Sequence, residues 1–234
     1  MSGKILRVCI DLDDTLIDTA SRYGEAAVRM SAIVMGNLGT DCPPPARLMA
    51  LADRFNRDLR SRLRGNPERF ALSWIKAYGE AAGELFDMAI AAKIRRTAEA
   101  VKGPPYRPFP EMEQALREIR EAGHSLHLIT AGDVSVQSRK IAYLGIGGIF
   151  ATVDIVPEDK TAPLSRIAGH CPDLTVMVGD SLDGDILPAN RMGIFSVRVM
   201  RQERLSEKME AIRPDRVISR IGRLPAVIRE IAKN

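Results

Sequence analysis

The chain has little of several residue types that would mark a specialised class of protein. Its 3 cysteines, Cys9, Cys42 and Cys171, are odd in number and widely spaced, so neither a disulfide framework nor a metal-binding cysteine motif is present. Aromatic residues make up only 5%, so stacking on nucleic-acid bases is not an evident theme. No apolar run approaches the length of a membrane span, and the first run is interrupted by Arg7. We therefore expect a cytoplasmic protein with neither a nucleic-acid nor a membrane partner.

Size and charge set wide limits. The 234 residues suggest one or two domains, and a hydrophobic content of 45% suits a globular protein with a substantial core. The formal net charge of +4 and the pI near 9.1 are mildly basic, which favours an anionic small molecule as much as a nucleic acid. The oligomeric state is left open by these numbers.

The most informative stretch is RVCIDLDDTL, residues 7–16. Its apolar, β-branched start predicts a short buried strand, which ends in Asp11, Asp13 and Asp14 and is followed by Thr15. Carboxylates gathered at a strand end repel one another and are costly to bury without a partner. A bound cation would remove that cost, so this stretch is a candidate metal site.

Residues 18–102 read as an all-helical block. Apolar residues at helical spacing, with glycine or proline at the breaks, predict helices over 19–38, 46–63, 67–82 and 84–101. The second of these is rich in arginine, which we interpret as a solvated face rather than a substrate-binding surface.

After residue 106, strands alternate with helices. The expected strands cover 125–129, 152–156, 174–178, 195–199 and 216–218. The expected helices between and after them cover 111–122, 134–144, 162–170, 185–192 and 225–232. This alternation predicts an α/β fold, a Rossmann-like parallel-sheet core formed by 1–17 and 103–234, with the helical block 18–102 as an inserted cap domain.

Polar residues follow several of the expected strands. Thr130 closes the strand 125–129, with Ala131 and Gly132 behind it, and Asp180 and Asp185 follow 174–178. Lys160 comes shortly after 152–156. The carboxyl ends of parallel strands share one edge of a sheet, so these residues are expected to meet there with Asp11 and its neighbours.

Taken together, these motifs resemble those of the haloacid dehalogenase (HAD) superfamily, specifically phosphatase-type members with a helical C1 cap after the first motif. Asp11 to Thr15 matches the DxDxT motif, and Gly179-Asp180 with Asp185 matches GDxxxxD. Thr130 matches the second motif and Lys160 the third. The cap resembles the family only in position, length and helical character.

The resemblance implies a Mg2+-dependent phosphatase of a small phosphorylated metabolite. Asp11 would be the nucleophile that forms an aspartyl-phosphate, and Asp13 the general acid and base. Mg2+ would be held by the carboxylates of Asp11 and Asp180 and by the backbone carbonyl of Asp13.

The remaining motif residues would support this chemistry. Thr130 and the amides of Ala131 and Gly132 would hold the phosphate oxygens, and Lys160 would add a fixed positive charge. Thr15 and Asp185 would act from a second layer, by orienting the groups that touch metal and substrate.

Several alternatives stay open at this point. Lys140, on the expected helix 134–144, rivals Lys160 as the active-site lysine, because Thr161 stands where the family often has proline. A phosphomutase of the same superfamily shares both aspartates, whereas relatives that dehalogenate or cleave phosphonates lack the second one. A non-catalytic binding module on the same fold is the remaining possibility, because a fold does not fix a function.

Overall fold

The computed structural model of this chain describes residues 3–63, 65–201 and 212–233. The chain divides into two compact units, Met1–Asp18 with Tyr106–Asn234 and Thr19–Pro105. The roles of catalytic core and cap that the sequence suggests for these two parts remain predictions. In the described part of the chain, no helix is both long and apolar enough to cross a membrane.

The first unit is built on a parallel sheet. Six strands in the described residues pair in the order β3-β2-β1-β4-β5-β6, and every neighbouring pair is parallel. Their bounds are β1 Arg7–Ile10, β2 Ser125–Ala131, β3 Thr152–Val156, β4 Thr175–Gly179, β5 Phe195–Val199 and β6 Arg216–Ile218. The predicted α/β, Rossmann-like fold class is confirmed by this topology.

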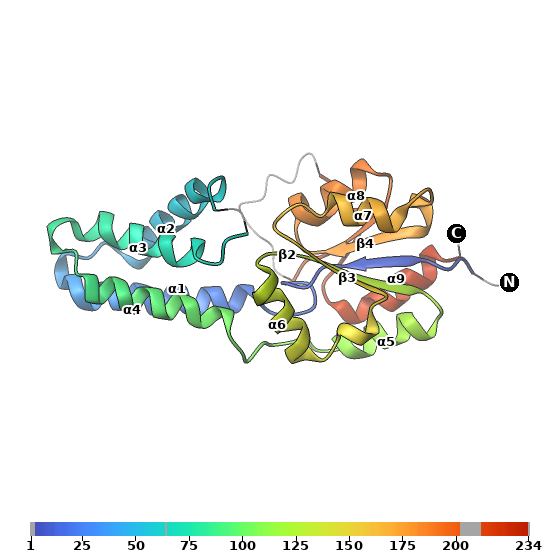
Figure 1. The fold of residues 1–234 in the computed structure, drawn as a ribbon, viewed down its shortest axis with the longest axis horizontal. Helices are drawn as coiled ribbons and strands as arrows, with labels where there is room; N and C mark the ends of the chain where they lie inside the picture. The colour runs from blue at the N-terminus through green and yellow to red at the C-terminus, as the bar shows by residue number, and fades with distance from the viewer. Residues whose placement is uncertain (1–2, 64, 202–211, 234) are drawn as a thin grey trace. The chain divides into compact units, whose positions relative to one another are not determined.

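Helices cover both faces of this sheet (Figure 1). On one face, α5 (Met112–Glu121), α6 (Val134–Leu144) and α9 (Leu224–Ile231) pack on a core that includes Val8 and Ile10. On the other face, α7 (Thr161–Ala168) and α8 (Leu187–Arg191) pack on a smaller core around Cys9. Successive β1 side chains point to opposite faces, and both are covered, which is why this strand reads as a continuous apolar run.

The strand order reverses at the centre of the sheet. β2 and β3 lie on one side of β1, whereas β4, β5 and β6 lie on the other. The backbone N–H of Asp11 continues the β1–β4 ladder by donating to the carbonyl of Val178 at 2.9 Å. Ligands of open parallel sheets bind beyond the carboxyl ends of the strands at such a reversal, so the candidate site is expected where β1 and β4 end.

The segments that leave and re-enter this unit are joined to each other. Ile17 forms an antiparallel bridge with Pro108, and the backbone N–H of Asp18 donates to the carbonyl of Arg107 at 2.8 Å. The two connections to residues 19–105 therefore lie side by side at one place in the sheet unit.

The second unit is helical and has a core of its own. Its main helices are α1 (Ala20–Leu38), α2 (Pro45–Arg60), α3 (Arg69–Ala82) and α4 (Met88–Glu99). Met30, Leu48, Trp74, Tyr78 and Ile94 are buried together at its centre. The Tyr78 hydroxyl donates to Asn37 Oδ1 at 2.7 Å and accepts from the Asp87 backbone N–H at 2.9 Å, which satisfies this buried polar group.

Several element boundaries differ from the expectation, and two of the differences have a clear physical reason. The expected helix 84–101 begins only at Met88, because the Asp87 carboxylate caps it by accepting from the Ala89 backbone N–H at 2.6 Å. Strand β2 continues to Ala131, since Thr130 and Ala131 pair with Ile155 and Val156 of β3. Thr130 thus lies inside the strand rather than after it.

Glu68 connects three segments of the helical unit. Just before α3, its carboxylate accepts from Lys102 Nζ at 2.9 Å and forms an ion pair with Arg95 of α4. The hydrogen bond from Lys102 is the main cause that lowers the Glu68 pKa below its ordinary 4.5. Because the side chain is 37% exposed, solvent screening limits the energy of this contact.

We expect Glu68→Gln to lower the free energy of unfolding at pH 7 by less than about 1 kcal/mol. A lowered folded-state pKa gives stability that is present above pH 4.5 and is lost as the pH falls through that lowered value. The difference between Glu68→Gln and wild type should therefore shrink below pH 4.5. Urea unfolding measures this difference in unfolding free energy. It is followed by the fluorescence of Trp74, which is the single tryptophan and a core residue of this unit. Glu84→Gln, at an exposed position in the turn before α4, is the matched control; equal effects of the two would contradict the assignment.

Candidate active site

Asp11 is the first residue after β1, and its carboxyl group is buried. Its side chain is 7% exposed, and the Thr15 hydroxyl donates to its Oδ2 at 3.2 Å. Thr15 thus contacts Asp11 directly, and its predicted supporting role remains a prediction. Between them, Asp14 has a φ of 59°, a left-handed conformation that lets the chain turn sharply after the strand.

Asp180 and Asp185 come from the end of β4. Ser181 caps the next turn by accepting from the Gly184 N–H at 3.0 Å, and the turn brings Asp185 back so that its Oδ2 accepts from the Ser181 N–H at 3.0 Å. Gly179 makes this return possible, because a Cβ there would lie 2.2 Å from the Asp185 carboxyl carbon.

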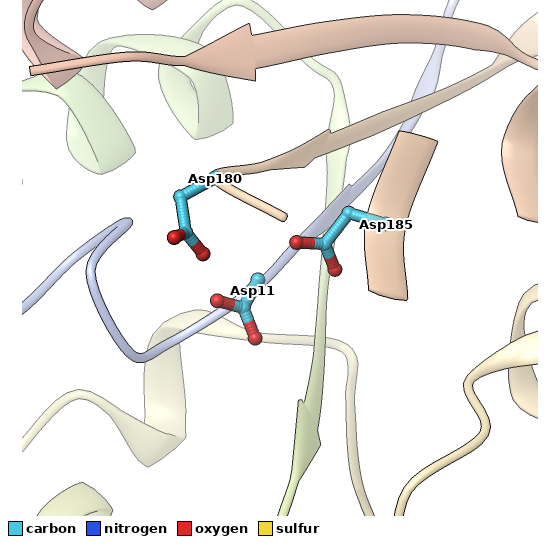
Figure 2. Close-up of side chains that lie close together, drawn as sticks. All are labelled: Asp11, Asp180 and Asp185. Carbon is cyan, nitrogen blue, oxygen red and sulfur yellow. The ribbon is translucent and has the colours of Figure 1, made fainter. Parts of the chain in front are cut away.

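The carboxyl groups of Asp11, Asp180 and Asp185 face a common space (Figure 2). One oxygen from each lies within 4.8 Å of the others. Asp11 and Asp185 are buried and Asp180 is half-buried. The sequence predicted Asp11 and Asp180 as metal ligands with Asp185 in support, and the structure brings all three together.

Lys160 lies between two of these acids. It directly precedes α7, is 5% exposed, and its Nζ forms an ion pair with Asp11 and contacts Asp185 Oδ1 at 2.6 Å. Burial raises the pKa of Asp11 well above its ordinary value, and Asp185 and Asp180 raise it further, whereas Lys160 lowers it. Burial by itself lowers the pKa of Lys160, but Asp11 and Asp185 raise it overall above its ordinary value. The lysine therefore remains charged and favours the anionic form of Asp11.

Asp13 is held by helix α6 rather than by the acidic cluster. Lys140 Nζ contacts both of its carboxylate oxygens, at 2.6 and 2.8 Å, and the Gln137 side-chain amide donates to Oδ2 at 2.8 Å. Both candidate lysines thus contact an acid of the first motif, but different ones. Lys160 is the one that contacts Asp11.

The end of β2 is only partly as expected. Thr130 is fully buried and its hydroxyl accepts a hydrogen bond from the Gln137 amide. The Gly132 N–H donates to the Val156 carbonyl at 2.8 Å, so this amide belongs to the sheet and not to the donors that we predicted for a phosphate. The reason is the extension of β2, which pairs with β3 as far as Ala131, two residues past the predicted strand end. The phosphate-binding roles of Thr130 and Ala131 remain predictions.

Two buried polar side chains at the site were missed by the sequence reasoning. Gln137 is 2% exposed, and Arg198 of β5 is 3% exposed and donates from Nε to the Asp180 carbonyl at 3.0 Å. A signal existed for Gln137, since it shares a helix face with Lys140 and Ile141, which are both buried. Arg198 gave none, because a single arginine in a strand is usually an edge or surface residue.

The fold is that of an α/β protein whose acids converge at the carboxyl edge of its sheet, an arrangement typical of enzymes. The family model of haloacid dehalogenase-like hydrolases matches residues 5–193, and the chain belongs to this family of hydrolases. The resemblance that the motifs indicated is thereby confirmed.

Two of the curated relatives match nearly the whole chain. The glyceraldehyde 3-phosphate phosphatase of Methanopyrus kandleri is 29% identical and covers 98% of this chain and 100% of its own length. The phosphoglycolate phosphatase of Neisseria gonorrhoeae is 27% identical over 94% of this chain and 90% of its own length.

Solved structures share the fold. A haloacid dehalogenase-like hydrolase from Xanthomonas campestris superposes with a TM-score of 0.75 at 22% identity, covering 98% of this chain and 97% of its own. The L-2-haloacid dehalogenase of Xanthobacter autotrophicus superposes with a TM-score of 0.61 at 18% identity, covering 96% and 98%. The fold is thus shared by proteins named for different reactions, and the site must distinguish between these reactions.

Gly179→Ala should displace Asp185, because the added Cβ would lie 2.2 Å from its carboxyl carbon and from Oδ2. We expect a loss of about 1–3 kcal/mol in unfolding free energy, typical of overpacking, and a loss of hydrolase activity. Thermal unfolding and a turnover assay measure the two effects. Gly148→Ala, where an added Cβ meets nothing within 4 Å, is the matched control. Unchanged stability and activity in Gly179→Ala would contradict the close packing described here.

Proposed function

We propose that this hydrolase is a Mg2+-dependent phosphatase of a small phosphorylated metabolite that works through an aspartyl-phosphate on Asp11. The observation that carries the proposal is Asp13, a second carboxylate on the same turn as Asp11. Phosphoryl transfer to Asp11 requires a proton for the leaving oxygen, and Asp13 would supply it. Displacement of a halide requires no such proton, so a dehalogenase has no use for this residue. The names of the curated relatives, which are phosphatases, support the same reading.

The acidic cluster fits a divalent cation. When ionised, Asp11, Asp180 and Asp185 carry three negative charges and Lys160 returns one positive charge, which leaves two to be balanced. The donors are all carboxylate oxygens, which Mg2+ prefers. Asp11, Asp180 and the Asp13 backbone carbonyl would hold the ion. Asp185, whose two oxygens accept from Lys160 and from the Ser181 N–H, would orient its neighbours. When bound, Mg2+ would neutralise charge between Asp11 and a phosphate oxygen.

Each of the site residues would have a defined role in the reaction. An Asp11 oxygen attacks phosphorus, the bond from phosphorus to the leaving oxygen breaks, and Asp13 gives that oxygen its proton. In the second half, the Asp13 carboxylate takes a proton from water, which attacks phosphorus and releases Asp11 and inorganic phosphate. Lys160 favours the anionic form of Asp11 before the first attack, and Thr130 would hold a phosphate oxygen.

Asp11→Asn should reduce phosphate release by at least about 10³-fold, because the amide keeps the shape of the nucleophile but not its reactivity. The assay measures inorganic phosphate from a panel of phosphomonoesters with Mg2+, including glyceraldehyde 3-phosphate and 2-phosphoglycolate. Asp183→Asn, an exposed acid in the turn that leads to Asp185, is the matched control and should retain wild-type turnover. Full activity in Asp11→Asn would refute the nucleophile. Interconversion of sugar-phosphate isomers without steady phosphate release would identify a phosphomutase instead.

Removal of divalent metal should abolish turnover, because the anionic substrate would then meet an uncompensated acidic cluster. We expect EDTA to reduce phosphate release to background and added Mg2+ to restore it. Asp180→Asn should need at least about tenfold more Mg2+ for half-maximal activity, whereas Asp183→Asn should match wild type. Turnover that persists in EDTA would remove the metal from the proposal.

A further inference from the structure

Helix α6 presents two buried polar side chains to Asp13. Gln137 and Lys140 are three residues apart on one helix face, and they are only 2% and 7% exposed. Polar side chains are seldom buried unless they have a defined partner, because they must give up their hydration. Here the shared partner is the Asp13 carboxylate, which belongs to a different segment of the sheet unit.

Lys140 fixes the orientation of this carboxylate. Its Nζ lies 2.6 Å from Oδ1 and 2.8 Å from Oδ2, so rotation of the carboxylate breaks at least one of the two contacts. The Lys140 side chain is 8% exposed and that of Asp13 is 26% exposed. Asp13 is therefore the more accessible partner, as a group that exchanges protons with a bound molecule must be.

Gln137 ties the same carboxylate to the end of β2. Its amide nitrogen lies 2.8 Å from Asp13 Oδ2 and 3.3 Å from the Ala131 carbonyl, and it also donates to the Thr130 hydroxyl. The Gln137 side chain packs against Gly132, where an added Cβ would lie 3.4 Å from Gln137 Cγ and Cδ. One buried amide thus joins the candidate acid to the strand end predicted to hold phosphate.

We propose that Gln137 and Lys140 are positioning residues that hold the Asp13 carboxyl group in place for proton transfer to the leaving oxygen. The inference rests on the proposed phosphatase function and deepens it. The proton moves from Asp13 to that oxygen while the bond to phosphorus breaks, and this transfer requires the two oxygens to lie within hydrogen-bond reach. Neither positioning residue touches the substrate in this account.

A comparison of substrates with different leaving groups distinguishes this positioning role from a purely structural one. An alkyl phosphate such as 2-phosphoglycolate leaves as a strongly basic alkoxide and needs a proton, whereas 2,4-dinitrophenyl phosphate leaves as a stable anion and does not. The ratio kcat/KM reports the steps up to departure of the leaving group, so it isolates the transfer in which Asp13 is the acid. The variants are Lys140→Met, Gln137→Leu and the conservative Lys140→Arg. Arg139→Met, at an exposed position on the same helix, is the matched control.

We expect Lys140→Met and Gln137→Leu to lower kcat/KM for the alkyl ester at least about tenfold more than for the aryl ester. Lys140→Arg should lose little kcat/KM on either ester, because arginine keeps the positive charge. Arg139→Met should lose none. Equal losses on both esters, or no loss, would overturn the inference while leaving the proposed phosphatase intact. A wild type that releases phosphate from no phosphomonoester of the panel would reject the proposed function and this inference with it.

A second measurement does not depend on turnover. In urea unfolding, Lys140→Met and Asp13→Asn should each lower the midpoint concentration of urea. The double variant should lower this midpoint by much less than the sum of the two single shifts, because both changes remove the same ion pair. Strictly additive shifts would show that the two side chains are not coupled and would overturn the inference.

Discussion

The ion pair of Lys160 with Asp11 and Asp185 is the interaction on which the site depends. Placing like charges in a buried cluster costs several kcal/mol per ion unless an opposite charge shares the space. Lys160 supplies that charge from the start of α7 and is almost fully buried itself. It favours the anionic state of Asp11, which burial and the neighbouring acids oppose. Removing the lysine alone would leave two buried acids without their common partner, so the stability of the cluster depends on one ammonium group.

The parallel sheet is what makes this arrangement possible. Asp11, Lys160 and Asp185 are far apart in sequence, but each follows the carboxyl end of a strand, and β1 and β4 are neighbours at the centre of the sheet. Covered on both faces, the sheet holds its strand ends rigidly, and the turns need only carry side chains a short distance. Gly179 shows how tight this design is, because the return of Asp185 occupies the volume that any side chain at 179 would need.

Much of this could be predicted from the sequence, for identifiable reasons. The strands were predictable because both faces of the sheet are buried, which gives short apolar runs such as residues 8–10, and the acids were predictable because they directly follow such runs. The features that the sequence did not predict depend on residues that are close in space but distant in the chain. The Gly132 amide is used by the β3 ladder, and no local pattern reveals how far that ladder extends. The two lysines could not be told apart by spacing, since each is buried against a different aspartate of one motif. The Gln137 contact joins residues 124 positions apart.

The pairing of the segment 17–18 with 107–108 has a consequence for how such chains change over time. Because the N–H of Asp18 and the carbonyl of Arg107 are 2.8 Å apart, the sheet unit closes on itself before the helices begin. An insert of any length at this point leaves the strand order unchanged, because the two segments that flank it are hydrogen-bonded to each other. A lineage can therefore exchange or shorten the insert while the sheet unit keeps its own pairing at this point.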